Sequence, residues 1–561
     1  MDRLQIAAIV VAVVLFAASI YFRPAASPPR VTELTPSPVA ETQNPPPQSE
    51  APIAPPRVTA EVTAAAQILT LRNDAVAVRV SSRGARVEGV ELLNYHATVA
   101  RDSGPVELVT TPLNGGMFLY LGGEPLRSFE DAPAQITSSD AQHVELRVER
   151  DGIVVTRKIE LDDSGHGGRF TVTIANDNAG GEALHPKLQL AFYGQERPAA
   201  APDHFPKYSL AVSADGSVKR TPLLGVGTSG FVNSLLGRGP PTGTAYPEPV
   251  EWVGVDSQYF LFAAVAQNPR EATGFAGPLG SDIGQAALTL EQFDVPPNTR
   301  LERSYRLYFG PKIEEIVAGV DPQLGRDIDA GYAFVRPLVA IFGSTLHWMY
   351  DHVVANYGIA IILLTVLVKL VTFPLTQRSM KSMKRFSLIA PQMKQIQEKY
   401  ANDSEKLQEE MMKLYRQKGM NPLTAFGGGC VPTLIQMPVL IALYFALQTS
   451  IDLRHAPFAL WIRDLSAPEN FLSIAGVPIR VLPLLMGGSM FLQQRLSPAP
   501  NADPQQRQMM TLMSVMFTFM FYQFPAGLVL YWLVSNVLGV VQQLLVNRSP
   551  QPATTASERA A

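Results

Sequence analysis

Apolar positions along this chain follow two kinds of pattern, and each predicts a different part of the molecule. Continuous apolar stretches stand at residues 4–22 and again beyond residue 320, and at 1.5 Å per residue several are long enough to cross a bilayer as helices. Between them, residues 58–318 alternate apolar and polar positions in short runs, which is typical of strands. The pattern therefore predicts a polytopic α-helical membrane protein that carries a large extracytoplasmic all-β domain.

The first apolar stretch and the segment after it predict a tether. The stretch exceeds the 7–15 apolar residues of a secretory signal, and no A-x-A site follows it directly. We therefore expect a retained transmembrane anchor over residues 1–23 in place of a cleaved signal. Residues 24–57 contain eleven prolines and predict an extended linker.

The alternating region predicts a β-sandwich over residues 58–318. Many short strands follow one another with no helical pattern between them, and "HVELRVERDGIVVTRKIELDD" predicts a hairpin about Asp151 and Gly152. No catalytic motif stands out in this region. We expect a water-soluble binding or spacer domain.

The C-terminal third predicts a helical membrane core. An apolar and aromatic segment, interrupted by Pro337 and Gly343 within residues 319–355, predicts an amphipathic helix on the outer membrane surface. Five apolar segments then lie at about 356–376, 431–449, 478–494, 509–524 and 526–546. With the anchor they make six predicted transmembrane helices, five of which form a core over 356–548, and a disordered tail follows at 549–561.

Charges between the predicted helices set the expected orientation. From Arg378 to Lys418 the chain has ten Lys and Arg against five Asp and Glu, and the positive-inside rule places such a loop in the cytoplasm. Apolar positions on both sides of "YANDS" predict a helical hairpin over residues 378–420. Both chain termini then lie in the cytoplasm, and the β domain lies on the other side of the membrane.

Composition and the missing motifs argue against several classes of function. The net charge of −3 gives no reason to expect nucleic-acid specificity, and the single cysteine, Cys430, cannot form an intramolecular disulfide. The eight histidines are scattered, and no metal, nucleotide or dinucleotide motif is present. We expect no cofactor, no metal site and no catalytic residue, so the protein is not predicted to be an enzyme.

Lys369 is a charge inside a predicted transmembrane helix, where it costs about 3 kcal/mol or more. Lys369 lies five residues before Pro374, so extension of its ammonium to the cytoplasmic surface is one explanation. However, Thr365, Lys369, Thr372 and Thr376 share one helical face, which predicts contact with protein or water. None of the five C-terminal spans contains Asp or Glu, so we expect a hydrated cavity that opens to the cytoplasm.

Other predicted helices offer polar partners for this face. They are Gln436, Thr518, Trp532, Ser535 and Asn536, although ordinary hydrogen bonds between helices would produce the same pattern. The fifth span also carries a row of methionines, which indicates either an adaptable apolar surface or plain packing. This row consists of Met509, Met513, Met516 and Met520.

The chain resembles the YidC/Oxa/Alb family of membrane insertases, in its Gram-negative form with a large periplasmic domain. The C-terminal motifs that carry the resemblance are "PLT", the basic hairpin, "MNPL", "IQMP", "APFALWIRDLS" and "FPAGLVLYWLVSN". Upstream, "SSRGARVEGVELLNY", "QYF" and "GPK" resemble the periplasmic domain.

The resemblance implies a location in the cell inner membrane, with the β domain in the periplasm and a cytoplasm-facing hydrophilic groove. Thr365 and Trp532 match groove positions, and Lys369 stands where the family usually has arginine, which keeps the charge but loses the bidentate fork. Apolar helices would leave the groove sideways into lipid. The implied partners are nascent membrane proteins, membrane lipids, the Sec translocon (SecYEG, SecDF), and the ribosome or the signal recognition particle receptor at the cytoplasmic hairpin.

Two other functions fit parts of the sequence. A secondary transporter also has hydrated charges inside the membrane, but it usually needs coupling-ion ligands and repeated halves. A membrane-anchored periplasmic binding module would make the polar helices incidental.

Overall fold

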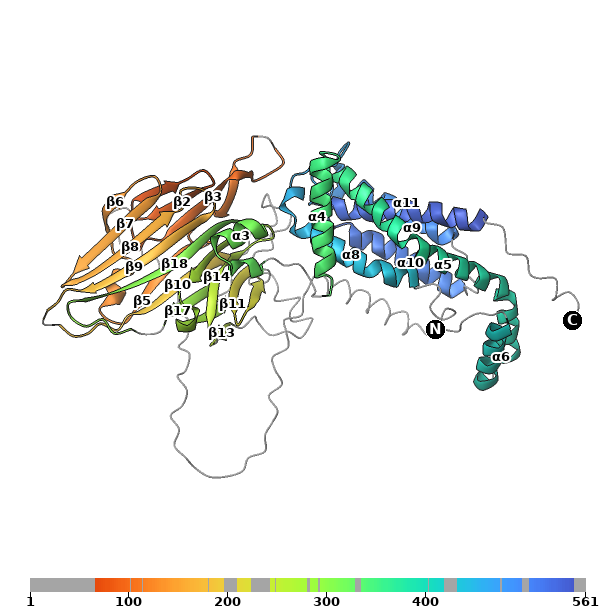
Figure 1. Ribbon diagram of the computed structural model, residues 1–561, viewed down its shortest axis with the longest axis horizontal. Helices are drawn as coiled ribbons and strands as arrows, with labels where there is room; N and C mark the ends of the chain where they lie inside the picture. Colours follow the sequence, from red (N-terminus) through yellow and green to blue (C-terminus); the bar gives the residue numbers. More distant parts are fainter. Residues whose placement is uncertain are drawn as a thin grey trace, which may run out of the picture.

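The computed structural model of this chain has a β-sandwich at one end and a bundle of helices at the other (Figure 1). It describes residues 66–548, except 101, 114, 180, 196–208, 223–242, 248, 280–282, 291–292, 328–333, 402, 418–430, 475–476 and 497–503. The predicted anchor at 1–23, the linker at 24–57 and the tail at 549–561 lie outside the described residues.

Two antiparallel sheets of nine strands each form the sandwich. In the first sheet the strands run in the order β1-β2-β3-β5-β10-β17-β16-β13, with β4 paired to β3. Their bounds are β1 (Ile68–Arg72), β2 (Val76–Ser81), β3 (Val87–His96), β4 (Pro105–Val109), β5 (Met117–Gly122), β10 (Lys187–Gln195), β13 (Thr244–Tyr246), β16 (Ala272–Pro278) and β17 (Ile283–Leu290).

In the second sheet the order is β12-β11-β14-β15-β18-β9-β8-β7-β6. The bounds are β6 (Gln135–Ser139), β7 (His143–Arg150), β8 (Ile153–Leu161), β9 (Gly167–Asn176), β11 (Ser209–Ala214), β12 (Ser217–Pro222), β14 (Val250–Asp256), β15 (Phe260–Ala266) and β18 (Thr299–Pro311). Short helices connect the strands or follow them: η1 (Leu126–Phe129), η2 (Pro269–Glu271), α3 (Glu314–Val320) and η3 (Leu324–Asp327).

The predicted hairpin about Asp151 and Gly152 is confirmed. Arg150 of β7 pairs with Ile153 of β8, which leaves a two-residue turn. Both turn residues have positive φ, +50° at Asp151 and +72° at Gly152, as the tight turns that match strand twist require.

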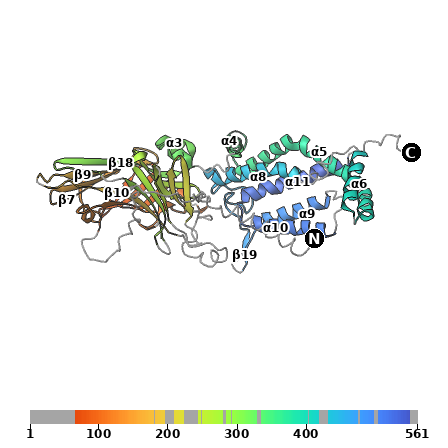
Figure 2. The ribbon, with the colours of Figure 1, turned by 90° about the horizontal axis from the view of Figure 1, so that it is seen from below.

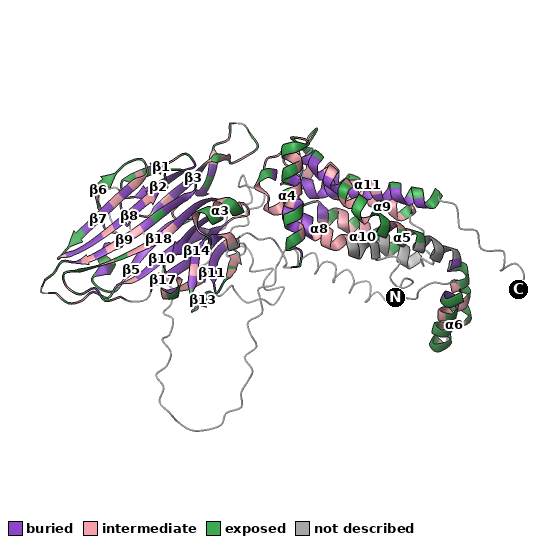
Figure 3. Ribbon diagram, in the orientation of Figure 1, coloured by how far each residue is buried: buried purple, intermediate pink, exposed green. Residues whose placement is uncertain are grey.

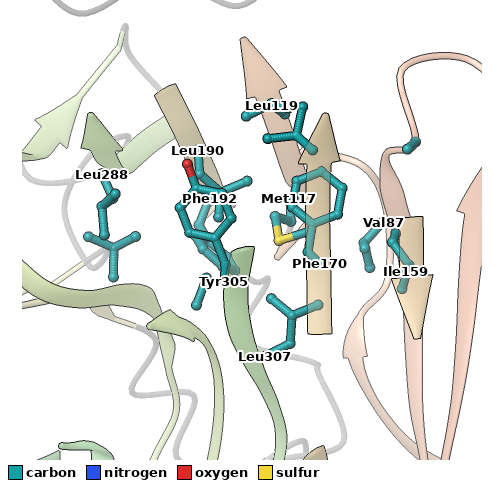
Figure 4. Packing of buried hydrophobic residues seen from close by; sticks show 14 of the residues in the cluster. Val87, Met117, Leu119, Ile159, Phe170, Leu190, Phe192, Leu288, Tyr305 and Leu307 are labelled. Atoms are coloured by element: carbon teal, nitrogen blue, oxygen red, sulfur yellow. The ribbon is translucent and has the colours of Figure 1, made fainter. Parts of the chain in front are cut away.

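The core of the sandwich lies between the two sheets, as the alternation predicts. Side chains from the facing strands interdigitate there (Figure 4), and the ring of Phe192 on β10 meets that of Phe262 on β15 edge-on, with centroids 4.8 Å apart. α3 covers the outer face of the second sheet, where Val317 packs with Trp252 and Tyr308. Most strand residues that face the core are fully buried (Figure 3).

Five helices lie side by side in the bundle, and a sixth, α4, crosses them at the end that faces the sandwich (Figures 1 and 2). The hairpin that ends in α6 extends from the opposite end. The bounds are α4 (Arg336–His352), α5 (Tyr357–Lys399), α6 (Ser404–Gln417), α8 (Val431–Thr449), α9 (Val481–Leu496), α10 (Pro504–Phe521) and α11 (Ala526–Arg548). Between α8 and α9 lie η4 (Ile451–Leu453) and a small hairpin of β19 (Leu472–Ile474) and β20 (Val477–Ile479).

The helices differ from the prediction in two places. α4 is continuous, because Pro337 stands in its first turn, where the missing N–H costs nothing, and Gly343 is accommodated inside it. α5 does not end near Pro374: it continues through Pro374 and Pro391 to Lys399, so one helix joins the predicted span to the hairpin.

The number of membrane-spanning helices stays a prediction. Among the described residues, α5 over Tyr357–Lys381 and α11 over Ala526–Arg548 are long and apolar enough to cross a membrane. Shorter apolar helices lie at Gln436–Thr449 and Thr511–Phe521.

The sandwich contacts the bundle through the loop that follows α8. Arg454 donates hydrogen bonds to the carbonyl oxygens of His96 (2.7 Å) and Ala97 (3.2 Å), and its guanidinium lies 5.5 Å from the ring centre of Phe260. The side chain of Gln258 donates to the carbonyl of Gln448 at 3.1 Å. These contacts tie the end of α8 directly to the β domain.

Candidate functional site in the helical bundle

The end of the bundle that faces the sandwich is closed by apolar packing. The first six residues of α11, Ala526 to Tyr531, are all buried, and the rings of Phe521 and Phe524 stack with centroids 4.9 Å apart. The backbone N–H of Gly527 donates to the carbonyl of Leu465 at 2.9 Å, and a Cβ on Gly527 would lie 3.1 Å from that oxygen. Side chains of α5, including Ile361 and Leu364, complete this core. Little polar surface is left here to hold water.

Two buried charges fix the loop beside this closed end. Glu469 accepts hydrogen bonds from the indole N–H of Trp461 and from the backbone N–H of Leu482 in the first turn of α9. Arg480 donates to the carbonyl of Tyr522 and to Oε1 of Gln523 at 3.0 Å. Sequence reasoning did not assign these roles, although Arg480 stands directly before an apolar helix, which is a signal for such a role.

On α5 the predicted polar face points toward α11. Thr376 is buried and its hydroxyl lies 2.9 Å from Nε2 of Gln542 on α11. Thr365 is fully buried and Thr372 is half-buried, and their hydroxyls donate to the carbonyls of Ile361 (2.6 Å) and Val368 (2.9 Å). Lys369 lies between them on this face, half-buried. Within the described part of the chain, no carboxylate forms an ion pair with its ammonium.

α11 carries the polar partners toward two other helices. The amide of Gln436 on α8 donates to the hydroxyl of Tyr531, and the amide of Asn536 donates to the hydroxyl of Ser489 on α9 at 3.1 Å. Ser535 is buried beside them. Ser489 and Tyr531 were not predicted, because neither stands out in an apolar helix until its neighbour is known.

Trp532 and Thr518 take different positions. The indole of Trp532 lies against Phe521, with centroids 5.2 Å apart, and its buried N–H has no partner among the described residues. Thr518 donates to the carbonyl of Ser514 at 2.9 Å, and its side chain lies against Gly487, so it faces α9. The structure therefore does not bring Thr518 together with the polar face of α5, which points to α11.

We call the polar residues that lie between the helices of the bundle the polar seam. It begins where the apolar packing ends and continues toward the end of the bundle that carries the hairpin. Its members are Thr365, Lys369, Thr372, Thr376, Gln436, Ser489, Tyr531, Ser535, Asn536 and Gln542.

The methionine row of α10 is half-buried. Met513, Met516 and Met520 are each partly covered, and the side chain of Met509 lies outside the described residues. The most exposed apolar side chains of α10 form a neighbouring row that sequence reasoning missed: Leu512, Val515 and Phe519. Phe519 has 74% of its surface exposed.

The hairpin at the other end has its own small core. Ile389 of α5 packs with Leu414 and Tyr415 of α6, at positions that the apolar pattern partly predicts. On its surface, Lys413 lies 3.0 Å from Glu409 and 2.8 Å from Glu410.

The chemistry of the polar seam is that of hydration and weak binding. It offers hydroxyls, amides and one ammonium, which hydrogen-bond to water and attract acidic groups. Among the residues that the structure describes, no cluster of three or more His, Cys, Asp or Glu is able to hold a metal ion.

Two family models together match most of the chain. The one described as the 60Kd inner membrane protein matches residues 348–553, and the one described as the YidC periplasmic domain matches residues 68–348. The border between the two matches falls inside α4.

Curated proteins named membrane protein insertase YidC are similar to this chain. The one from Geotalea daltonii is 31% identical over 566 residues, which cover 98% of this chain and 99% of that relative. The one from Geobacter metallireducens is 41% identical over 320 residues, 57% of this chain, so the match spans about half of that relative's length (55%). A solved structure titled an active YidC insertase with the first transmembrane domain resolved covers 87% of this chain and 94% of its own, at 18% identity and a TM-score of 0.36.

Proposed function

Since this chain belongs to the YidC family of inner-membrane proteins with a periplasmic domain, we propose that it inserts newly made membrane proteins into the inner membrane. The protein is not an enzyme, in agreement with the sequence prediction, because this is a family of insertases. In the proposed orientation the sandwich lies in the periplasm, and the hairpin and both termini lie in the cytoplasm.

The observation that carries the proposal is the change from apolar to polar packing along the bundle. At the periplasmic end α11 buries the block Ala526–Tyr531, and about one to three turns later it buries Ser535, Asn536 and Gln542. Water entering from the cytoplasm would find hydrogen-bonding partners along the polar seam and would stop at the apolar end. The proposed groove is therefore open to the cytoplasm and closed to the periplasm.

In this proposal the groove shortens the apolar distance that a polar segment must cross. Lys369 attracts acidic residues of the incoming protein, and the half-buried Thr372 and Gln436 replace part of the lost water. The buried Thr365, Ser535 and Asn536 form the polar base of the proposed groove. Trp532, with its unpaired N–H, is a further donor for the same segment. The reaction breaks no bond, so burial of the new transmembrane helix in lipid supplies the driving force.

The outer surface of α10 is the proposed exit for that helix. Its exposed row of Leu512, Val515 and Phe519 lies beside the half-buried methionine row. Together they form an apolar surface that can contact transmembrane helices of many different sequences, because methionine adapts to varied shapes. We propose that Met509 belongs to this surface and that Thr518, which faces α9, supports it.

We propose that the cytoplasmic hairpin receives partners. Its exposed helices extend beyond the bundle, as Figure 2 shows, where a ribosome or the signal recognition particle receptor has access. Cooperation with the Sec translocon (SecYEG, SecDF) is proposed on the resemblance of the sequence alone.

Insertion into liposomes that contain only this protein tests the proposal. The substrate is a single-span protein with an acidic translocated segment, followed by protease protection. We expect insertion by the native chain, a several-fold loss in Lys369→Ala and near-native insertion in Lys369→Arg. Lys381→Ala, an exposed lysine on the same helix, is the matched control and should insert normally.

The outcomes separate the roles. Equal insertion by all variants would reduce Lys369 to a lysine whose ammonium merely reaches the surface. Failure of the native chain with every substrate, while it folds normally, would contradict the insertase itself.

A further inference from the structure

The loop between α8 and α9 carries an apolar hairpin that the bundle does not cover. β19 and β20 are paired in antiparallel register, with Leu472 opposite Ile479. Phe471, Leu472 and Ile474 are exposed, Ile474 by 59%, although each is large and apolar. Residues 471–479 contain no charged side chain. An exposed apolar surface of this kind in a folded loop indicates an apolar surrounding.

The base of the hairpin is hydrogen-bonded to the bundle, whereas its apolar side chains have no cover. Glu469 and Arg480, which flank it, are both buried and are bonded to α9 and to the end of α10. The backbone N–H of Phe471 donates to the carbonyl of Ile479 at 3.0 Å, and the ring of Phe471 meets that of Trp461 edge-on at 5.1 Å. The two charged side chains next to the hairpin are therefore both hydrogen-bonded within the protein, and they fix the base of the hairpin.

The position of the hairpin identifies what surrounds it. It extends sideways from the bundle at the same end as α4 and on the opposite side (Figure 2). α4 lies across the bundle with Ile341 and Trp348 exposed, as an amphipathic helix in a membrane interface does. The hairpin and α4 therefore lie at the same level along the bundle, so a membrane surface at the level of α4 would also meet the hairpin.

The hairpin leads directly into α9, which also begins with exposed apolar side chains. Leu484 and Leu485, in the first turns of α9, are half exposed. α9 has 16 residues and a length of about 24 Å, shorter than the apolar core of a bilayer, about 30 Å. An apolar hairpin at its outer end adds depth on the side where the helix is too short.

We propose that the β19–β20 hairpin inserts into the outer leaflet of the membrane as a second interfacial anchor, opposite α4. Its ligand is the boundary between lipid headgroups and acyl chains. It extends the apolar surface on the outer side of the short α9, so that the remaining difference between the length of α9 and the bilayer thickness lies on the cytoplasmic side. This inference rests on the proposed membrane position of α9 and is independent of insertion activity.

Fluorescence quenching in proteoliposomes tests the anchor. The full-length chain with Cys430→Ser receives one bimane label, at Ile474→Cys, at Leu485→Cys on α9, or at Asp163→Cys on the exposed sandwich surface. Lipids with brominated acyl chains quench labels in the membrane, and iodide quenches labels in water. We expect Ile474 to follow Leu485, with bromolipid quenching several-fold stronger than at Asp163.

Each other result overturns a specific statement. If Leu485 is quenched by bromolipid and Ile474 by iodide, the hairpin is in water and the proposed anchor is wrong. If Ile474 is shielded from both quenchers, a protein covers it and the lipid assignment is wrong. If Leu485 itself is quenched by iodide, the membrane position of α9 fails, and with it the bundle topology on which the proposed function rests.

A matched pair of variants checks that apolar side chains set the depth. With the label at Leu472→Cys, Ile474→Asp should lower bromolipid quenching several-fold, and Ser473→Asp, on the alternate face of the strand, should lower it much less. Both changes affect exposed positions, so the fold is expected to remain. Equal loss in both variants would contradict an insertion that depends on the apolar face.

Discussion

The amide nitrogen of Asn536 on α11 lies 3.1 Å from the hydroxyl oxygen of Ser489 on α9, and this hydrogen bond joins two helices in the middle of the bundle. The backbone groups of both helices are satisfied internally, so side-chain bonds of this kind contribute to how the helices pair in lipid.

The first prediction concerns this bond. Asn536→Ala and Ser489→Ala should each destabilise the bundle, and a double-mutant cycle should give a coupling energy of about 0.6 kcal/mol, the average for such bonds in membranes. The measurement is unfolding of the full chain in detergent micelles. Val537→Ala, exposed on the same helix, should show no coupling to Ser489. Purely additive effects at positions 489 and 536 would mean that the bond contributes nothing.

Glu469 gives a second prediction. Glu469→Ala leaves the N–H of Leu482 at the buried start of α9 without its acceptor, and the indole N–H of Trp461 loses its partner as well. The expected loss is about 1–3 kcal/mol for each buried group left unpaired. Thermal unfolding of the full chain measures it.

Asp464 provides the comparison for Glu469. It accepts from the N–H and the hydroxyl of Ser466 at 2.8 and 2.7 Å but is only half-buried, so water can replace it. Asp464→Ala should cost clearly less. An equal loss in the two variants would show that burial of Glu469 is not the deciding factor.

The contact between sandwich and bundle gives a third prediction. Arg454→Ala removes both hydrogen bonds to the loop after β3, so the sandwich should occupy a wider range of positions. Distances between spin labels at Asp163 and Ile341, in a Cys430→Ser chain, should broaden in Arg454→Ala and broaden less in Arg454→Lys. An unchanged distance distribution in Arg454→Ala would mean that other contacts, such as Gln258 with Gln448, hold the sandwich against the bundle.

A fourth prediction concerns pH. Burial lowers the pKa of His166 below its ordinary value of 6.5, against smaller opposing effects of its bond to the Phe309 carbonyl and of Asp74. As pH falls below 6.5, the unfolded chain takes up a proton at this histidine before the folded chain does, so the free energy of unfolding of the sandwich should decrease. The decrease ends once pH passes the lower pKa of the folded state.

Urea unfolding of the full chain at a series of pH values measures this dependence. His166→Phe should flatten the slope below pH 6.5, whereas His96→Gln, at an exposed histidine, should leave most of it. A slope that stays unchanged in His166→Phe would assign it to another group.

Patterns within one element were predicted well from the sequence. The spacing of Thr365, Lys369, Thr372 and Thr376 is enough to place them on one face, and the bond between Thr376 and Gln542 fixes where that face points. The turn at Asp151 and Gly152 was predicted for the same reason, since its geometry depends on adjacent residues. The roles of these residues in insertion stay predictions.

Contacts between elements were not predicted. Ser489 becomes a partner of Asn536 only once α9 and α11 lie together, and Glu469 is bonded to α9 only after the loop has folded back. The end of α5 was misplaced because proline disfavours a helix locally, while packing of Ile389 against Leu414 stabilises its continuation. Tertiary packing determines these hydrogen-bond partners and this helix end, and a local sequence pattern does not contain it.

The continuity of α5 has a mechanical consequence. Its 43 residues have a contour length of about 65 Å, and the helix begins beside the apolar core at the sandwich end and bends where it enters the hairpin (Figure 1). Pro374, five residues after Lys369, and Pro391 have no N–H to donate to the preceding turn, so α5 lacks two backbone hydrogen bonds between the charge and the hairpin. A movement of the hairpin would therefore reach Lys369 through one continuous helix. The helix that holds the charge is thus also the mechanical connection between the bundle and the hairpin.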